Sequence, residues 1–353
     1  MKGVEIMKAM VLVLALQIFL SFFILGCSET PRQEFLPEDV QHSIPLDEIF
    51  DGGPGKDGIP ALTNPRVVSV QTGNQYLHSA EIVLGVTFNG ESRAYPIRIM
   101  NWHEIVNDQV GGVSILVSYC PLCGTGIVFD SRIKGKVHIF GVSGLLYNSD
   151  LLMYERGTKE ASLWAQLLGE AVVGPFTGTK LEILPSVQTT WGEWLIQHPD
   201  TTVLDVNTGF SRDYNKDPYF GYDENSSTFF PVSNRDNRLS SKEWVYGITV
   251  GDAHKAYKLE SLKAKGVLND SVAGTNLVLI AEAESSGVRA FERASHTFTG
   301  RAADLRDEAG VKWKLTEDAL INTKTGERLN RVQGVNSFWF GWVAFFPDTE
   351  LFQ

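Results

Sequence analysis

Two of the three cysteines in the chain, Cys120 and Cys123, lie in the sequence SYCPLCGTGIVF, with a proline between them and a glycine directly after the second. Two thiolates at this spacing on a tight turn point to the same side of the chain, which suits a soft or borderline metal ion such as copper or zinc. The same pair could instead form a disulfide, or one thiol could act as a nucleophile. The residues around the pair help to decide which of these three chemistries applies.

The residues after the pair argue against a redox enzyme of the thioredoxin type. In such an enzyme a helix begins at the first cysteine, and its free amides lower the pKa of that thiol. Here GTGIVF predicts a strand, and no βαβ pattern surrounds it. The CPLCG sequence is instead similar to the turn of rubredoxin-type and zinc-ribbon knuckles. A metal site is our first hypothesis, a structural Cys120–Cys123 disulfide the second, and an enzyme with Cys120 as nucleophile and His103 as base the third.

A knuckle of this kind supplies two ligands, and the chain contains no second CxxC pair. His103, in NWHEIVND, is the candidate third ligand, because a helix that returns beside strand 113–119 brings it part of the way back to the cysteines. Met153 or His138 is the candidate fourth ligand. Glu104 directly follows His103, so it is a weaker candidate for a partner that orients the histidine or for a catalytic general base.

The elements that must position these residues follow from local patterns. IVLGVTF and SRAYPI, joined by Asn89-Gly90, predict a hairpin, because Asn-Gly favours the positive φ angles of a tight turn. RIMNWHEIVND predicts a short helix, and VSILVSY and GIVF predict strands. TTWGEWLIQHP predicts a helix that is N-capped by Thr189 or Thr190 and ends before Pro199. We therefore expect an α+β fold that is mostly antiparallel β.

The chain also resembles itself. The sequence from Gly85, GVTFNGESRAYPIRIMNWHEIVNDQVGGVSILV, aligns without gaps on GITVGDAHKAYKLESLKAKGVLNDSVAGTNLVL from Gly247, an offset of 162 positions. Further matches follow at an offset of 148, including Trp191 with Trp339, Trp194 with Trp342 and Pro199 with Pro347. Two such runs in the same order predict two homologous lobes that arose by internal duplication.

The comparison of the two lobes separates residues kept for folding from candidates for function. Shared residues such as Tyr95, Asn107 and Trp194 are expected to be structural. The chemistry changes completely at four positions of the first lobe: Cys120 becomes Glu282, Cys123 becomes Ser285, His103 becomes Lys265 and Glu104 becomes Gly266. We therefore expect the site in the first lobe and a degenerate scaffold copy in the second.

The N-terminus has the pattern of a bacterial lipoprotein signal peptide over residues 1–26. A lysine-bearing start and an apolar run end in Ile-Leu-Gly-Cys, which resembles a lipobox and predicts lipidation of Cys27. An uncleaved signal-anchor helix is the alternative reading. Either reading places the folded part outside the cytoplasm, on the periplasmic side or at the cell surface, with the membrane as a partner through the anchor.

The remaining organisation follows from composition and from the repeat. The predicted segments are a tether over 27–60, rich in glycine and proline, a first lobe over 61–204, a connection over 205–241, and a second lobe over 242–353. SRDYNKDPYFGY, in the connection, is expected to border a cleft. The net charge of −11 argues against a nucleic-acid partner, which requires a basic face.

DGIPAL, AYP, HEIVND, SYCPLCGTG, the run FGVSGLLYNSDLLMYERGTKEASLWAQLLGEAVVGP, TTWGEW and HPDTTVL together resemble the bacterial family catalogued as domain of unknown function 3179. The resemblance begins near Asp57 and covers most of the chain. It implies that HEIVND and YCPLC belong to one site, and it supplies no activity. From the residues we expect an extracytoplasmic lipoprotein with a copper or zinc site, for metal handling or metal-dependent redox chemistry. The alternative is a non-enzymatic binding or scaffold lipoprotein with an oxidised cysteine pair.

Overall fold

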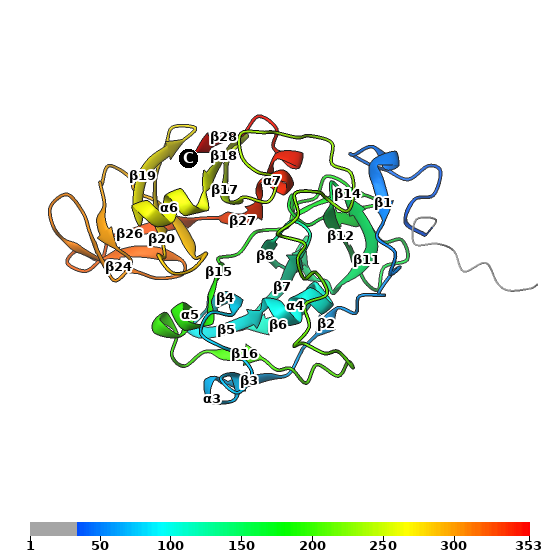
Figure 1. The fold of residues 1–353 in the computed structure, drawn as a ribbon, viewed down its shortest axis with the longest axis horizontal. Helices are drawn as coiled ribbons and strands as arrows, with labels where there is room; N and C mark the ends of the chain where they lie inside the picture. Colours follow the sequence, from blue (N-terminus) through cyan, green and yellow to red (C-terminus); the bar gives the residue numbers. More distant parts are fainter. Residues whose placement is uncertain (1–33) are drawn as a thin grey trace, which may run out of the picture.

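The structure of the chain is a computed structural model that describes residues 34–353. The predicted signal peptide and Cys27 lie outside the described residues. Strands dominate the described part and most pairs are antiparallel, as the sequence predicted (Figure 1). No helix in residues 34–353 is long and apolar enough to cross a membrane.

The N-terminal part of the described chain, residues 34–204, contains three main sheets. Their strand orders are β15-β4-β5-β16-β3, β2-β6-β7-β8 and β1-β11-β12-β13-β14, and β9 and β10 form a separate pair. The helices of this part are η1 (Leu46–Glu48), α3 (Val70–Gly73), α4 (Ile97–His103) and α5 (Trp191–Gln197). Its strands are β1 (Ile49–Asp51), β2 (Leu62–Thr63), β3 (Val67–Ser69), β4 (Ile82–Phe88), β5 (Glu91–Pro96), β6 (Ile105–Val110), β7 (Val113–Cys120), β8 (Thr125–Asp130), β9 (Arg132–Ile133), β10 (Lys136–Val137), β11 (Phe140–Tyr147), β12 (Asp150–Glu155), β13 (Leu163–Ala165), β14 (Glu170–Val173), β15 (Val187–Thr190) and β16 (Thr202–Leu204).

The C-terminal part, residues 242–353, contains a four-stranded sheet, β27-β17-β18-β28, and an eight-stranded sheet, β19-β20-β21-β26-β25-β24-β23-β22. The first and last strands of the larger sheet approach each other, so it nearly closes into a barrel. The elements are β17 (Trp244–Val250), β18 (Ala253–Lys258), α6 (Leu259–Lys265), β19 (Val267–Val272), β20 (Thr275–Ala281), β21 (Val288–Glu292), β22 (Thr299–Arg301), β23 (Asp304–Arg306), β24 (Lys312–Leu315), β25 (Ala319–Asn322), β26 (Arg328–Val332), β27 (Gly334–Phe338), α7 (Trp339–Phe345) and β28 (Glu350–Phe352).

The predicted hairpin, strands and second helix are present. Asn89 and Gly90 have φ angles of 50° and 85° and join β4 to β5, and β7 and β8 form the hairpin that carries the cysteines. Thr190 caps α5, because its Oγ1 accepts a hydrogen bond of 3.3 Å from the amide of Glu193. These elements formed where their local sequence signals were strongest.

The helix predicted from RIMNWHEIVND is shorter than expected. It ends at His103, because Glu104 has a φ of 56°, which turns the chain out of the helix. The following residues form β6, where the β-branched residues Ile105 and Val106 are fully buried between neighbouring strands. The end of α4 therefore points Glu104 and the start of β6 into the interior.

Part of the predicted tether is folded. Strand β1 pairs with β11, and the amide of Asp57 donates a 2.9 Å hydrogen bond to the carbonyl of Val142. The Asp57 carboxylate also accepts hydrogen bonds of 2.5 Å from Tyr154 and from Arg156. The residues of DGGPGKDG thus pack against β11 and β12 through main-chain and side-chain contacts that their composition did not reveal.

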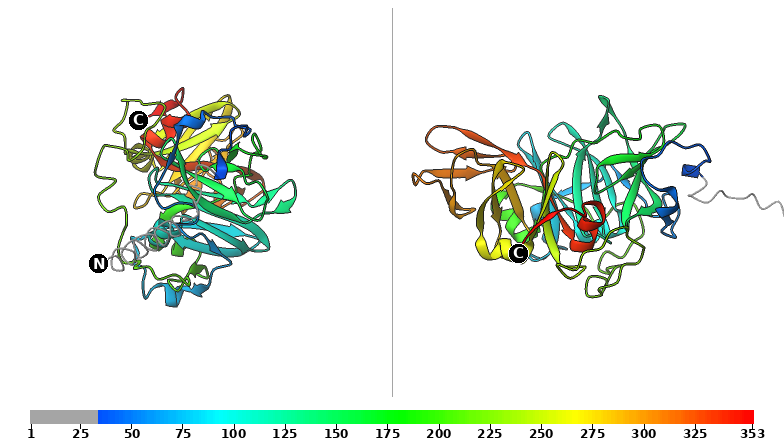
Figure 2. Two further views of the ribbon diagram at one scale, coloured as in Figure 1. Left: turned by 90° about the vertical axis from the view of Figure 1, so that its right-hand side faces the viewer. Right: turned by 90° about the horizontal axis from the view of Figure 1, so that it is seen from above.

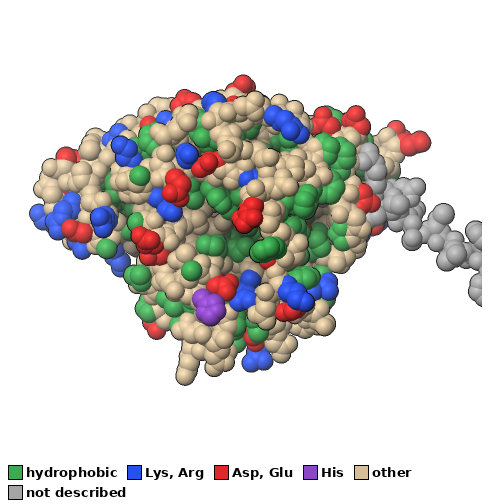
Figure 3. All heavy atoms as spheres, viewed as in Figure 1, with side chains coloured by type: hydrophobic (Ala, Val, Ile, Leu, Met, Phe, Trp, Pro, Cys, Tyr) green, Lys and Arg blue, Asp and Glu red, His purple; other side chains and the backbone are tan. Residues whose placement is uncertain are grey.

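The two parts lie side by side along the long axis of the molecule, with β24 near one end and β1 near the other (Figures 1 and 2). Their core is shared, since the buried cluster around Cys120 and Cys123 includes Phe338 and Phe340 from the C-terminal part. The connection over 205–241 runs over the surface between them and contributes buried tyrosines, Tyr214 and Tyr222. On the face shown in Figure 3, hydrophobic side chains gather across the middle, and acidic and basic side chains are scattered around them.

Candidate metal centre

Three side chains with metal-ligating atoms meet inside the N-terminal part: Cys120, Cys123 and Asp150. Their two sulfurs and a carboxylate oxygen all lie within 4.8 Å of one another. Each residue is at most 1% exposed to solvent. Among the described residues this is the one group of three or more His, Cys, Asp or Glu side chains that satisfies the geometry of a metal site.

Two tight turns position the three groups. Cys120 ends β7, and the turn that carries Cys123 closes at Gly124, whose φ of 69° is accessible to glycine at little cost. Asp150 begins β12 after a turn in which Asn148 and Ser149 have φ angles of 55° and 60°. The two turns belong to different sheets, and their side chains meet at one point.

The carbonyl of Ser149 lies next to both sulfurs. It accepts hydrogen bonds from the Cys123 thiol at 3.3 Å and from the Cys120 thiol at 3.7 Å. Both cysteines are free thiols in the structure. Helix α7 covers the pair from the other side, because a Cβ placed on Gly341 would lie 3.1 Å from the Cβ of Cys123. The pair is therefore enclosed by both parts of the molecule.

Burial sets the protonation of the two thiols. It raises the pKa of Cys120 and raises that of Cys123 still more, and the neighbouring Asp150 carboxylate adds to both shifts. A nucleophilic cysteine requires the opposite shift, which a cationic neighbour or a helix N-terminus provides. The geometry thus favours metal ligation, in which the cation itself stabilises the thiolates, over a thiol enzyme.

Asp150 has one satisfied and one unsatisfied oxygen. Its Oδ2 accepts a 2.9 Å hydrogen bond from the amide of Leu167, whereas its Oδ1 is buried and has no hydrogen-bond partner in the described structure. Burial raises the pKa of this carboxyl to about 7. A buried polar atom without a partner costs about 1–3 kcal/mol, so the site gains if an ion binds there.

Glu104 lies next to this group at the end of α4. It is 7% exposed, and burial, with a smaller contribution from the Asp150 charge, raises its pKa to about 8. Its Oε1 accepts a long 3.4 Å hydrogen bond from the Tyr219 hydroxyl. A carboxyl group with this pKa exchanges a proton near neutral pH, as general acids and bases do.

His103, the predicted third ligand, lies outside this group. Its Nδ1 donates a 2.7 Å hydrogen bond to the carbonyl of Pro60, and its Nε2 accepts one of 2.6 Å from the hydroxyl of Tyr214. Burial lowers its pKa, so the ring is neutral and both nitrogens are engaged. The histidine thus links the segment before β2 to the connection over 205–241.

Of the two candidate fourth ligands, His138 lies outside the group. Met153 is fully buried on β12 in the same hydrophobic core cluster as the cysteines, where it pairs with Trp164 across the sheet. His138 is half-buried, lies edge-on to Phe176 at 5.9 Å between ring centroids, and has a pKa lowered by burial. Both side chains have packing roles in the structure.

Sequence reasoning missed Asp150. The residue lies three positions before Met153, a candidate fourth ligand. The signal that could have found it is the polar turn Asn148-Ser149-Asp150 between two apolar runs, because such a turn places its last residue at the end of the sheet. An aspartate in a turn is common, however, and only the fold brings it to the cysteines.

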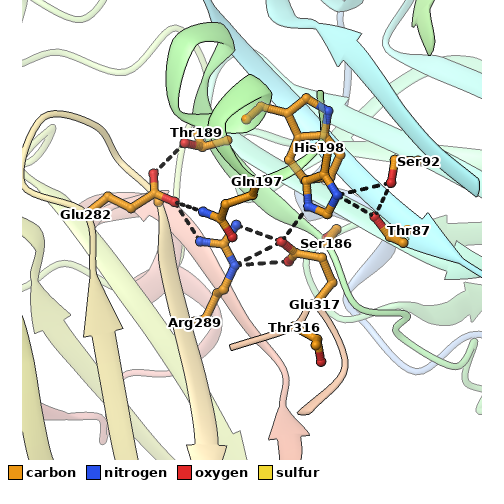
Figure 4. Close-up of polar contacts among 12 residues, drawn as sticks. Thr87, Ser92, Ser186, Thr189, Gln197, His198, Glu282, Arg289, Thr316 and Glu317 are labelled. Carbon is orange, nitrogen blue, oxygen red and sulfur yellow. Dashed lines mark hydrogen bonds and ion pairs between the residues drawn. The ribbon is translucent and has the colours of Figure 1, made fainter. Parts of the chain in front are cut away.

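The positions that align with the cysteines hold a buried ion-pair network (Figure 4). Glu282 pairs with Arg289 at 2.6 Å and accepts a 2.5 Å hydrogen bond from Thr189, and Ser285 donates to the same carboxylate. Arg289 continues to Glu317 at 2.8 Å. Arg331 lies 3.8 Å from the same Glu317 carboxylate, so two arginines face the two acids in this buried network.

Comparison with known proteins identifies a family that covers most of the chain. The family described as Protein of unknown function (DUF3179) matches residues 56–349. The chain belongs to the DUF3179 family. Within this DUF3179 domain lie α4, both cysteines and Asp150, so the complete candidate site is part of the family region. A search of curated proteins and a search of solved structures gave no match.

Proposed function

We propose that the chain is an extracytoplasmic lipoprotein, lipidated at Cys27, whose N-terminal part holds a resident zinc ion through Cys120, Cys123 and Asp150. The observation that carries this proposal is the buried Asp150 Oδ1, which has no partner in the described structure and belongs to a group that includes two free thiols. Three protein ligands with a further position for water or substrate is the ligand number of catalytic zinc sites. His103 is replaced by Asp150 in this ligand set.

The ligand types favour zinc over copper. Two thiolates suit either ion, but a carboxylate oxygen is a hard ligand that zinc accepts readily and that copper(I) disfavours. The group contains no histidine, which copper sites in proteins commonly use. Copper is therefore the second candidate.

The burial of the site supports a resident ion rather than metal delivery. A protein that transfers a metal needs ligands that a partner can reach, and these three residues are at most 1% exposed. Glu104, with a pKa raised to about 8, adds a proton donor and acceptor beside the site. A bound zinc ion would supply Lewis-acid activation of a substrate or water, and Glu104 would hold or move the proton.

We further propose that the two parts arose by duplication. The support is a set of matched contacts. The glycines Gly85 and Gly247 each contact a tryptophan so closely that a Cβ would lie 2.4 Å and 2.3 Å away. Asn107 exchanges two hydrogen bonds with the main chain of Phe140, as Asn269 does with that of Phe298. In both parts two strands flank the central hairpin in the same sense: β15 and β27 pair antiparallel with β4 and β17, and β16 and β28 pair parallel with β5 and β18.

Metal analysis tests the main proposal. The chain from residue 28 onward, which keeps every described element, is purified under reducing conditions, reconstituted with zinc and then dialysed. We expect one zinc per chain, loss of that zinc in Cys120→Ser/Cys123→Ser, and unchanged zinc in Met153→Leu and His138→Asn. Cysteine-independent or absent zinc overturns the proposal, and stoichiometric copper with weak zinc binding favours copper.

The disulfide scaffold is the alternative, and titration of thiols in the unfolded, unreduced protein separates it. Two reactive thiols per chain from residue 28 onward, where only Cys120 and Cys123 remain, support the metal site. Their absence, with recovery of both after reduction, supports the scaffold.

A further inference from the structure

A cavity of about 400 Å³ lies beside Glu104. Most of its walls come from three segments that are distant in the chain: the folded stretch after β1, the β11–β12 hairpin and the connection over 205–241. Glu104, after α4, and Leu122, in the β7–β8 turn, complete the lining. Leu122, between the two cysteines, and Leu151, next to Asp150, form the side that faces the metal centre. The cavity is therefore separated from the ligand group by one layer of side chains.

The lining is apolar except at one place. Leucine, valine, isoleucine and phenylalanine side chains make up most of it, and the titratable groups among the described lining residues are Glu104 and Tyr219. Burial and the adjacent Glu104 raise the pKa of Tyr219, so its hydroxyl stays neutral. No lysine, arginine or histidine is among the described lining residues, so nothing there balances a negative charge on a ligand.

The backbone fixes one wall of the cavity. The amide of Gly52 donates a 2.8 Å hydrogen bond to the carbonyl of Gly144. A Cβ on Gly144, whose φ is 80°, would lie 2.6 Å from the main chain of Gly55. This close approach holds the wall in place in the absence of a ligand. The opposite side is more open, because Phe229 is 64% exposed at the rim.

We propose that this cavity binds a small apolar molecule with one hydrogen-bonding group and no negative charge, and that this group contacts Glu104. Apolar walls and aromatic rings would hold the hydrocarbon part. The site disfavours anions, because no basic side chain is among the described lining residues to balance a negative charge in apolar surroundings. Binding requires only the folded chain, so its failure is distinguishable from failure of the zinc proposal.

Binding is tested with N-phenyl-1-naphthylamine, a neutral probe whose fluorescence rises in apolar sites. We expect saturable binding at one site per metal-free chain. Leu146→Trp fills the cavity and should weaken binding at least tenfold, while the matched Ile196→Trp, at a residue 74% exposed on α5, should leave it unchanged. Phe229→Ala, at the exposed rim, should weaken binding severalfold. This second variant tests the cavity independently if Leu146→Trp does not fold.

Charge selectivity is tested by displacing the probe with three ligands on one ring system. 1-Naphthalenemethanol and 1-naphthylmethylamine should displace it, and 1-naphthaleneacetate should be at least tenfold weaker. Glu104→Gln should weaken the amine at least tenfold and leave the alcohol within threefold. Equal displacement by the carboxylate, or probe binding that Leu146→Trp and Phe229→Ala both leave unchanged, overturns the proposal.

Discussion

A carboxylate oxygen of Asp150 lies within 4.8 Å of the Cys120 sulfur, and both groups are shielded from water. The two residues come from different sheets, since Cys120 ends β7 and Asp150 begins β12. Burial raises the pKa of both groups, and the Asp150 charge raises that of the Cys120 thiol further. A bound cation would stabilise the ionised forms of both groups and would account for their position side by side.

Asp150→Asn tests the third ligand. The amide keeps the shape of the side chain but is a poor ligand. Loss of a residue that only hydrogen-bonds to a metal ligand typically lowers metal affinity about 10–100-fold, and zinc affinity should fall at least this much here. Competition with a chromophoric chelator measures it. Asp130→Asn is the matched control, since Asp130 is also buried but pairs with Arg132 away from the site. Equal zinc affinity in Asp150→Asn and the unchanged chain removes Asp150 from the ligand set.

Zinc affinity should rise with pH. The pKa values of both thiols are raised, and that of Asp150 is raised to about 7, so the metal must displace protons from its ligands. The apparent affinity should therefore increase steadily from pH 6 to pH 8. Calorimetry in buffers of different ionisation enthalpy counts the protons released. A proton count of zero contradicts the raised pKa values.

The metal-free chain should lose stability as pH rises. Glu104 has a pKa of about 8 when folded and an ordinary value of 4.5, so the folded state keeps a proton that the unfolded state releases. Stability is therefore highest below the ordinary value and falls as pH rises toward the folded value, by at most about 1.4 kcal/mol per pH unit for this group. Urea unfolding between pH 5 and pH 8 measures the slope. Glu104→Gln should make it shallower, and an unchanged slope would exclude Glu104 as its source.

Arg289→Met should destabilise the chain strongly. The substitution removes the cation that pairs with both Glu282 and Glu317 and leaves Glu282 with uncharged hydrogen-bond partners, and breaking a buried pair in this way costs about 3–5 kcal/mol. Denaturant unfolding measures the loss. Arg306→Met is the matched control, because its ion pair with Asp304 is exposed and should contribute less than about 1 kcal/mol. Similar losses in the two variants would contradict the buried network.

Gly85→Ala and Gly247→Ala should have similar costs. In each, the added methyl group meets the ring of the paired tryptophan, Trp194 or Trp342, at 2.4 Å or 2.3 Å. Overpacking of this kind costs about 1–3 kcal/mol. Thermal or denaturant unfolding of the two variants measures it. A cost at one position and none at the other would count against matched packing in the two parts.

Local sequence signals predicted the hairpins, because the preference of a turn for certain residues and the preference of β-branched residues for strands both depend on only a few neighbouring positions. They predicted α4 too long, because the helical pattern of RIMNWHEIVND continues past His103 while the burial of Ile105 and Val106 in a sheet favours a strand. The tether was misjudged for a related reason. Its glycines indicate flexibility in isolation, but Gly52 and Gly55 allow a close main-chain approach to Gly144.

The sequence by itself determined the cysteine pair and its turn between two strands, since both depend on neighbouring residues. Only the tertiary structure decided which side chains join the pair. It brought Asp150 to the sulfurs and engaged His103 with Pro60 and Tyr214. The physical reason is that ligand geometry is set by how separate sheets pack, and a spacing along the chain does not specify where strands from different sheets end.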